Sequence, residues 1–135
     1  MENIKLCNAR ANESHESSLS NGRMQPGVTL SNGVEMPLEG FGVFQVPDPA
    51  VCKQAVLDAI RTGYRLVDTA QVYMNEAAVG EAVREAIAEG LVKREELFIT
   101  TKLWVSDFSY EGAKGAFRRS MERLGLEYQI GRAPV

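Results

Sequence analysis

The chain has few of the residues that build metal sites and disulfide frameworks. Its 135 residues include only two cysteines and one histidine. Cys7 and Cys52 lie far apart and form no paired-cysteine motif, so we interpret both as free thiols of a protein in the reducing cytoplasm. His15 stands alone in a polar stretch. We therefore expect no structural zinc site and no other bound metal.

The sequence also lacks a long apolar run and a cluster of basic residues. No stretch approaches the roughly 20 apolar residues of a membrane-spanning helix. No apolar segment follows the first few charges, so we do not expect a secretory signal. The formal net charge is −3 and the Lys and Arg residues are dispersed, which argues against nucleic-acid or membrane partners. Apolar residues still make up 44% of the chain, which suits one packed domain.

The N-terminal part of the chain has no regular apolar pattern. Residues 1–26 are rich in Ser, Asn and Glu, and we expect them to form a disordered leader. A hairpin signal follows. Asn32-Gly33 lies between the segments Val28-Thr29-Leu30 and Val34-Glu35-Met36, which predicts two antiparallel strands joined by a tight primed turn.

After Pro37 the pattern alternates between short strands and amphipathic helices. Apolar strands are expected at residues 40–44, 64–67 and 97–101. Asp48 and Asn75 are placed to cap the first two helices, and the third is expected at about residues 110–124 with one apolar stripe: Ala113, Phe117, Met121 and Leu124. Strands separated by single helices should be parallel. The order fits either a doubly wound sheet or a (β/α)8 barrel.

Polar residues at the strand ends are arranged as a barrel requires. A dinucleotide-binding doubly wound sheet should carry three glycines at its first turn, and the segment from Gly40 to Gly42 supplies only two. In a barrel the chemistry lies at the C-terminal ends of the strands. Asp68 ends the second strand, Tyr73 lies in the loop after it, and Lys102 ends the third strand.

Those three side chains form a chemically sensible group. A free phenol and a free lysine both have pKa values near 10, so neither is a good acid at pH 7. An ammonium group beside a phenol favours the phenolate, which makes the tyrosine a stronger proton donor. Asp68 would hold Lys102 charged and in place. The hypothesis is a general acid aimed at a carbonyl oxygen; the alternative for each residue alone is ordinary packing or a solvated charge.

Two long motifs resemble the aldo-keto reductases. One covers residues 63–80 and begins Gly-Tyr-Arg-Leu-Val-Asp-Thr-Ala, and the other covers residues 93–104 and ends Phe-Ile-Thr-Thr-Lys-Leu-Trp. Residues 36–42 are similar to the family's opening strand. The resemblance implies an α/β fold, a partial (β/α)8 TIM barrel with an N-terminal hairpin, about three β-α units and parallel strands. It implies an oxidoreductase that reduces small aldehydes or ketones with NADPH or, less often, with NADH.

The resemblance also assigns roles to individual positions. Asp68, Tyr73 and Lys102 match three of the family's four catalytic residues. The positions that match cofactor contacts are Val43, Phe44 and Asp68. The positions that match the wall of the substrate pocket are Phe44 and Trp104.

The chain departs from the family's pattern after residue 128. Family members continue into a fourth strand that ends in a catalytic histidine, whereas residues 129–135 carry Gly, Arg and Pro, and we interpret them as a tail outside the family. A closed barrel takes about 250 residues. We therefore expect residues 27–128 to be the N-terminal part of a barrel, in a truncated form that does not turn over. The alternatives are a non-catalytic accessory protein of this fold and a half-barrel that pairs with another chain.

Overall fold

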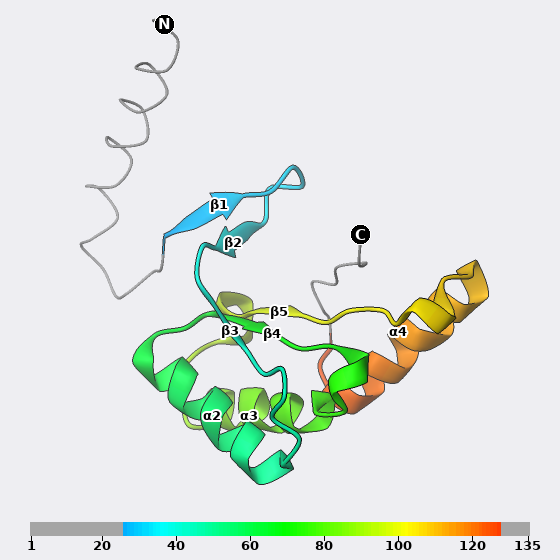
Figure 1. The fold of residues 1–135 in the computed structure, drawn as a ribbon. Helices are drawn as coiled ribbons and strands as arrows, with labels where there is room; N and C mark the ends of the chain where they lie inside the picture. The colour runs from blue at the N-terminus through cyan, green and yellow to red at the C-terminus, as the bar shows by residue number, and fades with distance from the viewer. Residues whose placement is uncertain (1–25, 128–135) are drawn as a thin grey trace, which may run out of the picture.

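The computed structural model describes residues 26–127. It contains a two-stranded antiparallel ribbon and a three-stranded parallel sheet. In the view of Figure 1, helices α2 and α3 lie below the parallel sheet and the ribbon lies above it. The expected leader, apart from Pro26, and the expected tail lie outside the described residues.

The elements follow the predicted order. The ribbon consists of β1 (Gly27–Thr29) and β2 (Glu35–Pro37), and the parallel sheet has the order β3 (Gly40–Gly42), β4 (Leu66–Asp68) and β5 (Phe98–Thr100). The helices are α2 (Pro49–Thr62), α3 (Glu76–Ala88) and α4 (Tyr110–Leu124), with short 3-10 turns η1 (Gln71–Tyr73), η2 (Arg94–Glu96) and η3 (Val105–Asp107). The alternation of parallel strands and helices confirms the α/β prediction, and the arrangement is that of part of a barrel.

The hairpin forms where the sequence predicts it, but the predicted two-residue turn is wrong. The Leu30 amide donates to the Val34 carbonyl at 2.8 Å, and the Gly33 amide donates to the Leu30 carbonyl at 2.9 Å. Three residues therefore form the loop, and Gly33 has a φ of 82°. A turn followed by one left-handed glycine is the usual form of a three-residue hairpin loop, so the glycine is needed, but only at one position.

Helix α2 begins as predicted. The Asp48 carboxylate accepts hydrogen bonds from the amides of Ala50 and Val51 at 2.9 and 3.0 Å, and Pro49 occupies the first helical position. Gly63 ends the helix at a φ of 115°, a backbone conformation that residues with a side chain rarely adopt.

Removing the carboxylate cap should weaken the fold measurably. We expect Asp48→Ala to lower the free energy of unfolding by about 1 kcal/mol, because two amide donors of the first turn lose their acceptor. Urea denaturation followed by circular dichroism measures the change. Asp48→Ser keeps a capping oxygen and should remain close to the parent. An alanine variant as stable as the serine variant would show that the cap contributes nothing.

The hydrophobic core lies between the sheet and helices α2 and α3. The fully buried side chains include Val56, Val67, Val79, Val83 and Ile99. Cys52 is also fully buried on α2, and this burial raises the pKa of its thiol. Within residues 26–127, no helix has both the length and the apolar character needed to cross a membrane.

The buried face of helix α4 matches the predicted stripe only in part. Leu124 is buried as predicted, together with Ala116 and Ser120, whereas Phe117 is 52% exposed. The reason is the close approach of α3: a Cβ atom on Gly80 would lie 1.9 Å from the Leu124 carbonyl oxygen. A separation this small leaves no room for a side chain at position 80, and two of the three buried residues of α4, Ala116 and Ser120, are correspondingly small.

One carboxylate joins three elements around this contact. The Glu76 side chain, at the start of α3, is 1% exposed. It accepts a hydrogen bond from the Thr101 hydroxyl at 2.7 Å, and its second oxygen lies 3.3 Å from a guanidinium nitrogen of Arg123 on α4. The buried charge therefore has both a donor and a cation, as a buried carboxylate requires.

Candidate active site

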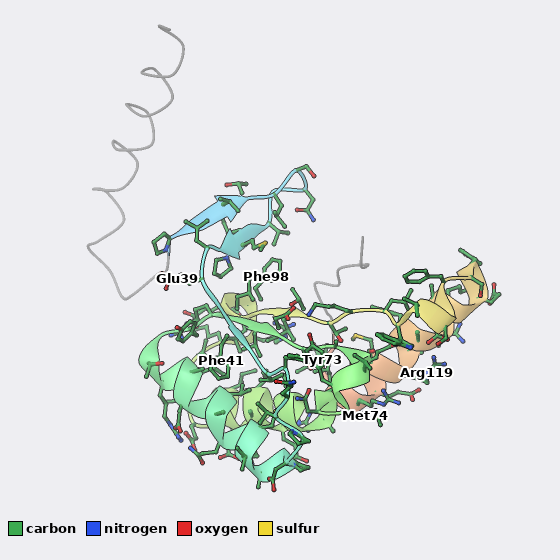
Figure 2. All side chains as sticks on the ribbon, viewed as in Figure 1. Glu39, Phe41, Tyr73, Met74, Phe98 and Arg119 are labelled. Atoms are coloured by element: carbon green, nitrogen blue, oxygen red, sulfur yellow. The ribbon has the colours of Figure 1, made fainter. Side chains whose placement is uncertain are left out.

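The C-terminal ends of the parallel strands meet at one edge of the sheet. Gly42, Asp68 and Thr100 occupy the same register position in β3, β4 and β5. Figure 2 shows Tyr73 and Met74 toward α4, away from Glu39 and Phe98, which mark the beginnings of β3 and β5. The predicted polar residues are therefore on the side of the sheet where a barrel places its chemistry.

Asp68 and Lys102 form an ion pair at this edge. The Lys102 Nζ atom lies 2.5 Å from one Asp68 carboxylate oxygen and 3.1 Å from the Thr69 carbonyl oxygen. The two side chains are 36% and 35% exposed, so the pair is open to solvent on one side. The prediction that these residues meet is correct because adjacent parallel strands end together.

A second hydroxyl fixes the carboxylate. Thr100 donates to the other Asp68 oxygen at 2.6 Å. The sequence interpretation missed Thr100, because its position opposite Asp68 is known only once the two strands are paired in register. Each oxygen of the Asp68 carboxylate therefore has a hydrogen-bond partner, and these two contacts fix the orientation of the carboxylate toward Lys102.

Tyr73 completes the group. Its ring centroid lies 5.3 Å from the Lys102 Nζ atom, within the range of a cation–π contact. The Phe44 ring packs against it with a centroid distance of 5.0 Å and an angle of 51°. The structure therefore brings together the residues proposed for acid catalysis and one residue proposed for substrate binding.

An open hollow of about 390 Å³ lies beside Tyr73. Its walls are two chain segments, residues 44–47 after β3 and residues 72–73 of η1. The Phe44 side chain is 64% exposed at this position, so an aromatic face is available next to the phenol. Small-molecule pockets have volumes of roughly 300–1,000 Å³, and this hollow lies at the lower end of that range.

The other two predicted positions are placed differently. The Val43 side chain is fully buried in the core, its amide donates to the Asp68 carbonyl at 3.2 Å, and its carbonyl accepts from Asn75. Val43 therefore belongs to the core next to the site and is connected to Asp68 and Asn75 through its backbone. Its contact with the cofactor stays a prediction. Trp104 is 48% exposed just before η3. Among the described side chains it makes no ring contact with Phe44 or Tyr73, so its place in the pocket wall also stays a prediction.

Asn75 has a role that the sequence interpretation did not identify. It occupies the N-cap position of α3, but its side chain makes no capping hydrogen bond, so the predicted cap is wrong. The amide instead donates to the carbonyls of Val43 and Val46 at 2.9 and 3.2 Å and accepts from the Thr69 hydroxyl at 2.8 Å. Buried carbonyl groups need hydrogen-bond donors, and the Asn75 side chain bonds to them instead of to the free amides at the start of α3.

A second amide supports the same loop from the other side. The Gln71 side chain donates to the Ala116 carbonyl at 2.9 Å and to the Ser120 hydroxyl at 3.0 Å. It ties η1 to α4, whereas Asn75 ties the end of that loop to the segment after β3. The segment that carries Tyr73 is therefore held at both ends by neutral amide side chains.

Comparison with known proteins places this arrangement in context. The model of the aldo/keto reductase family matches residues 40–129. An uncharacterized oxidoreductase, YtbE, of Bacillus subtilis (strain 168) is 51% identical over 105 residues, covering 78% of this chain and 38% of the relative. NADPH-dependent D-xylose reductase of Candida boidinii is 48% identical over 103 residues, covering 76% of this chain and 32% of that protein.

A solved structure agrees with the sequence relatives. The crystal structure of a Bombyx mori aldo-keto reductase in complex with NADP superimposes with a TM-score of 0.74 at 39% sequence identity. The match covers 80% of this chain and 37% of that chain. The chain thus spans between about a third and two fifths of the length of these proteins.

Proposed function

Because the chain belongs to the aldo/keto reductase family, we propose that it supplies the acid side of an active site that reduces small aldehydes or ketones with NADPH. The observation that carries the proposal is the group formed by Asp68, Lys102 and Tyr73 at the strand ends. It lies beside a hollow large enough for a small carbonyl compound. The xylose reductase named above uses NADPH by its name, and the Bombyx mori structure holds NADP.

The residues at the hollow fit the reactive end of such a cofactor. The exposed Phe44 ring and the backbone of residues 44–47 form a wall beside the phenol, and a flat aromatic ring can lie against a surface of this kind. When bound, the nicotinamide supplies hydride to a carbonyl carbon. The residues of this chain would then orient the carbonyl and provide the proton for its oxygen.

Tyr73 is the proposed proton donor. A carbonyl that accepts hydride develops negative charge on its oxygen, and a positioned donor neutralises that charge as it forms. The Lys102 ammonium lies 5.3 Å from the centre of the Tyr73 ring, so a positive charge is held beside the proposed donor. Asp68 holds the ammonium, and Thr100 holds Asp68. This chain of contacts supports an enzyme over a non-catalytic accessory protein, since packing alone does not need it.

The proposal can be tested in a complete barrel. Residues 26–127 would be joined to the remainder of the Bacillus subtilis oxidoreductase, and NADPH consumption with a small aldehyde would be followed by absorbance. We expect turnover. We also expect Lys102→Met to lower this turnover by at least about tenfold, because a general acid contributes about 10²–10⁴-fold and the Lys102 charge beside Tyr73 is proposed to assist the proton transfer. A folded graft without turnover, beside an active natural relative, would contradict the proposal.

A further inference from the structure

The Asn75 side chain is a buried amide whose hydrogen-bonding groups all have partners. The residue is 3% exposed. Both of its N–H directions are used, one for the Val43 carbonyl and one for the Val46 carbonyl, and its oxygen accepts from Thr69. Since it does not cap α3, these contacts define what the side chain does.

The two carbonyls mark the ends of the segment that walls the hollow. Phe44 and Gln45 lie between them, and both are exposed. Gln45 has a φ of 58°, a left-handed conformation that residues with a side chain rarely adopt. An exposed segment in such a conformation is retained only when its surroundings determine it. The two Asn75 hydrogen bonds are contacts that do so.

The same residue lies next to the segment that carries the proposed acid. Tyr73 precedes it by two positions, and Met74 between them has a φ of 58°. The Met74 amide donates to the Gln71 carbonyl at 3.2 Å, which closes the turn. The two left-handed residues thus belong to the two segments that face one another through the Phe44 and Tyr73 rings.

We propose that Asn75 is a positioning residue that sets the separation between the Phe44 ring and Tyr73, and with it the shape of the hollow in which a small carbonyl substrate would meet the acid. The proposal rests on the proposed function only where it calls this hollow the substrate site. The geometric part concerns one amide, two carbonyls and two rings. It predicts that changing the amide releases the Phe44 segment without disturbing the sheet.

Asn75→Asp is the sharpest test, because it keeps the size of the side chain and removes both donors. A carboxylate would then face two carbonyl oxygens, and all of these groups are hydrogen-bond acceptors. In the full-length, isotope-labelled chain, NMR should show the contact between the Phe44 and Tyr73 ring protons. We expect the variant to lose this contact and to shift the amide signals of residues 44–46, while signals from β4 and β5 remain.

Gln71→Met is the matched control. It removes an amide of the same loop that also makes two hydrogen bonds, but to α4 rather than to the segment after β3. We expect the ring contact to persist in this variant even if its thermal stability falls. An Asn75→Asp protein that keeps the ring contact would overturn the proposal, and so would a Gln71→Met protein that loses it.

A milder variant covers the case in which Asn75→Asp does not fold. Thr69→Val leaves both Asn75 donors in place but removes the hydroxyl that orients the amide. We expect a weaker ring contact in this protein, and an unchanged contact would overturn the proposal. None of these measurements requires turnover, so an inactive graft would count against the proposed function and leave the positioning role to be decided separately.

Discussion

A Tyr73→Phe substitution in the grafted barrel should lower turnover by about 10²–10⁴-fold, the usual contribution of a general acid. The substitution removes only the hydroxyl. The remaining ring can still pack against Phe44 and lie beside the Lys102 ammonium. The loss therefore reports on the proton rather than on the shape of the hollow.

Two further measurements make this result specific. NADPH binding, followed by fluorescence titration, should be unchanged, since the hydroxyl is not expected to hold the cofactor. Tyr64→Phe removes the same group from a tyrosine whose ring packs on Phe41 at 5.9 Å, and it should keep parental turnover. If Tyr73→Phe reduced aldehydes at the parental rate, the acid would have to be another residue.

Gly80→Ala should destabilise the chain by about 3 kcal/mol or more, at the upper end of the range for overpacking. A Cβ atom at this position would lie 1.9 Å from the Leu124 carbonyl oxygen and 2.6 Å from its carbon. Both are backbone atoms near the C-terminal end of α4, so no flexible side chain can move aside. The helices would have to separate, which would weaken the contact of Glu76 with Arg123.

The matched control for this prediction is Gly115→Ala within α4. The nearest atom to the added methyl group is a terminal nitrogen of Arg119 at 3.3 Å, and that side chain can shift. An alanine in a helix interior is more stable than a glycine by about 0.5–1 kcal/mol, so this variant should be slightly stabilised. Urea denaturation measures both changes. Equal stability of the Gly80→Ala variant and the parent would mean that the helices do not approach as described.

The parts of the site that could be predicted from the sequence depend on strand order. Parallel strands end at one edge, so Asp68 and Lys102 had to be neighbours once their strands were assigned. Tyr73 followed from the short loop after Asp68. Thr100 and Asn75 were missed because a hydroxyl and an amide carry no charge pattern, and their partners are distant in sequence.

The errors in the fold have a similar origin. Apolar spacing in α4 favoured a face containing Phe117, but the closeness of Gly80 and Leu124 selects the small residues Ala116 and Ser120. Asn75 has a side chain suited to helix capping, yet it forms hydrogen bonds with two carbonyls of another loop instead. In each case a long-range contact, which local periodicity does not contain, decides between two locally reasonable structures.

The register of the parallel sheet has a consequence for how the chain folds. Leu66 pairs with Gly40 on one side and with Phe98 on the other, so each pairing closes a long loop of chain. Closing such loops costs conformational entropy before native contacts stabilise the chain. Non-local strand pairing is therefore slow compared with the formation of a hairpin, which takes about 1–10 μs. The ribbon of β1 and β2 can therefore form early and alone. Asp68 and Lys102 meet only after β4 has paired with β5, so an intermediate that had formed only the β3–β4 pairing would lack the ion pair of the proposed acid.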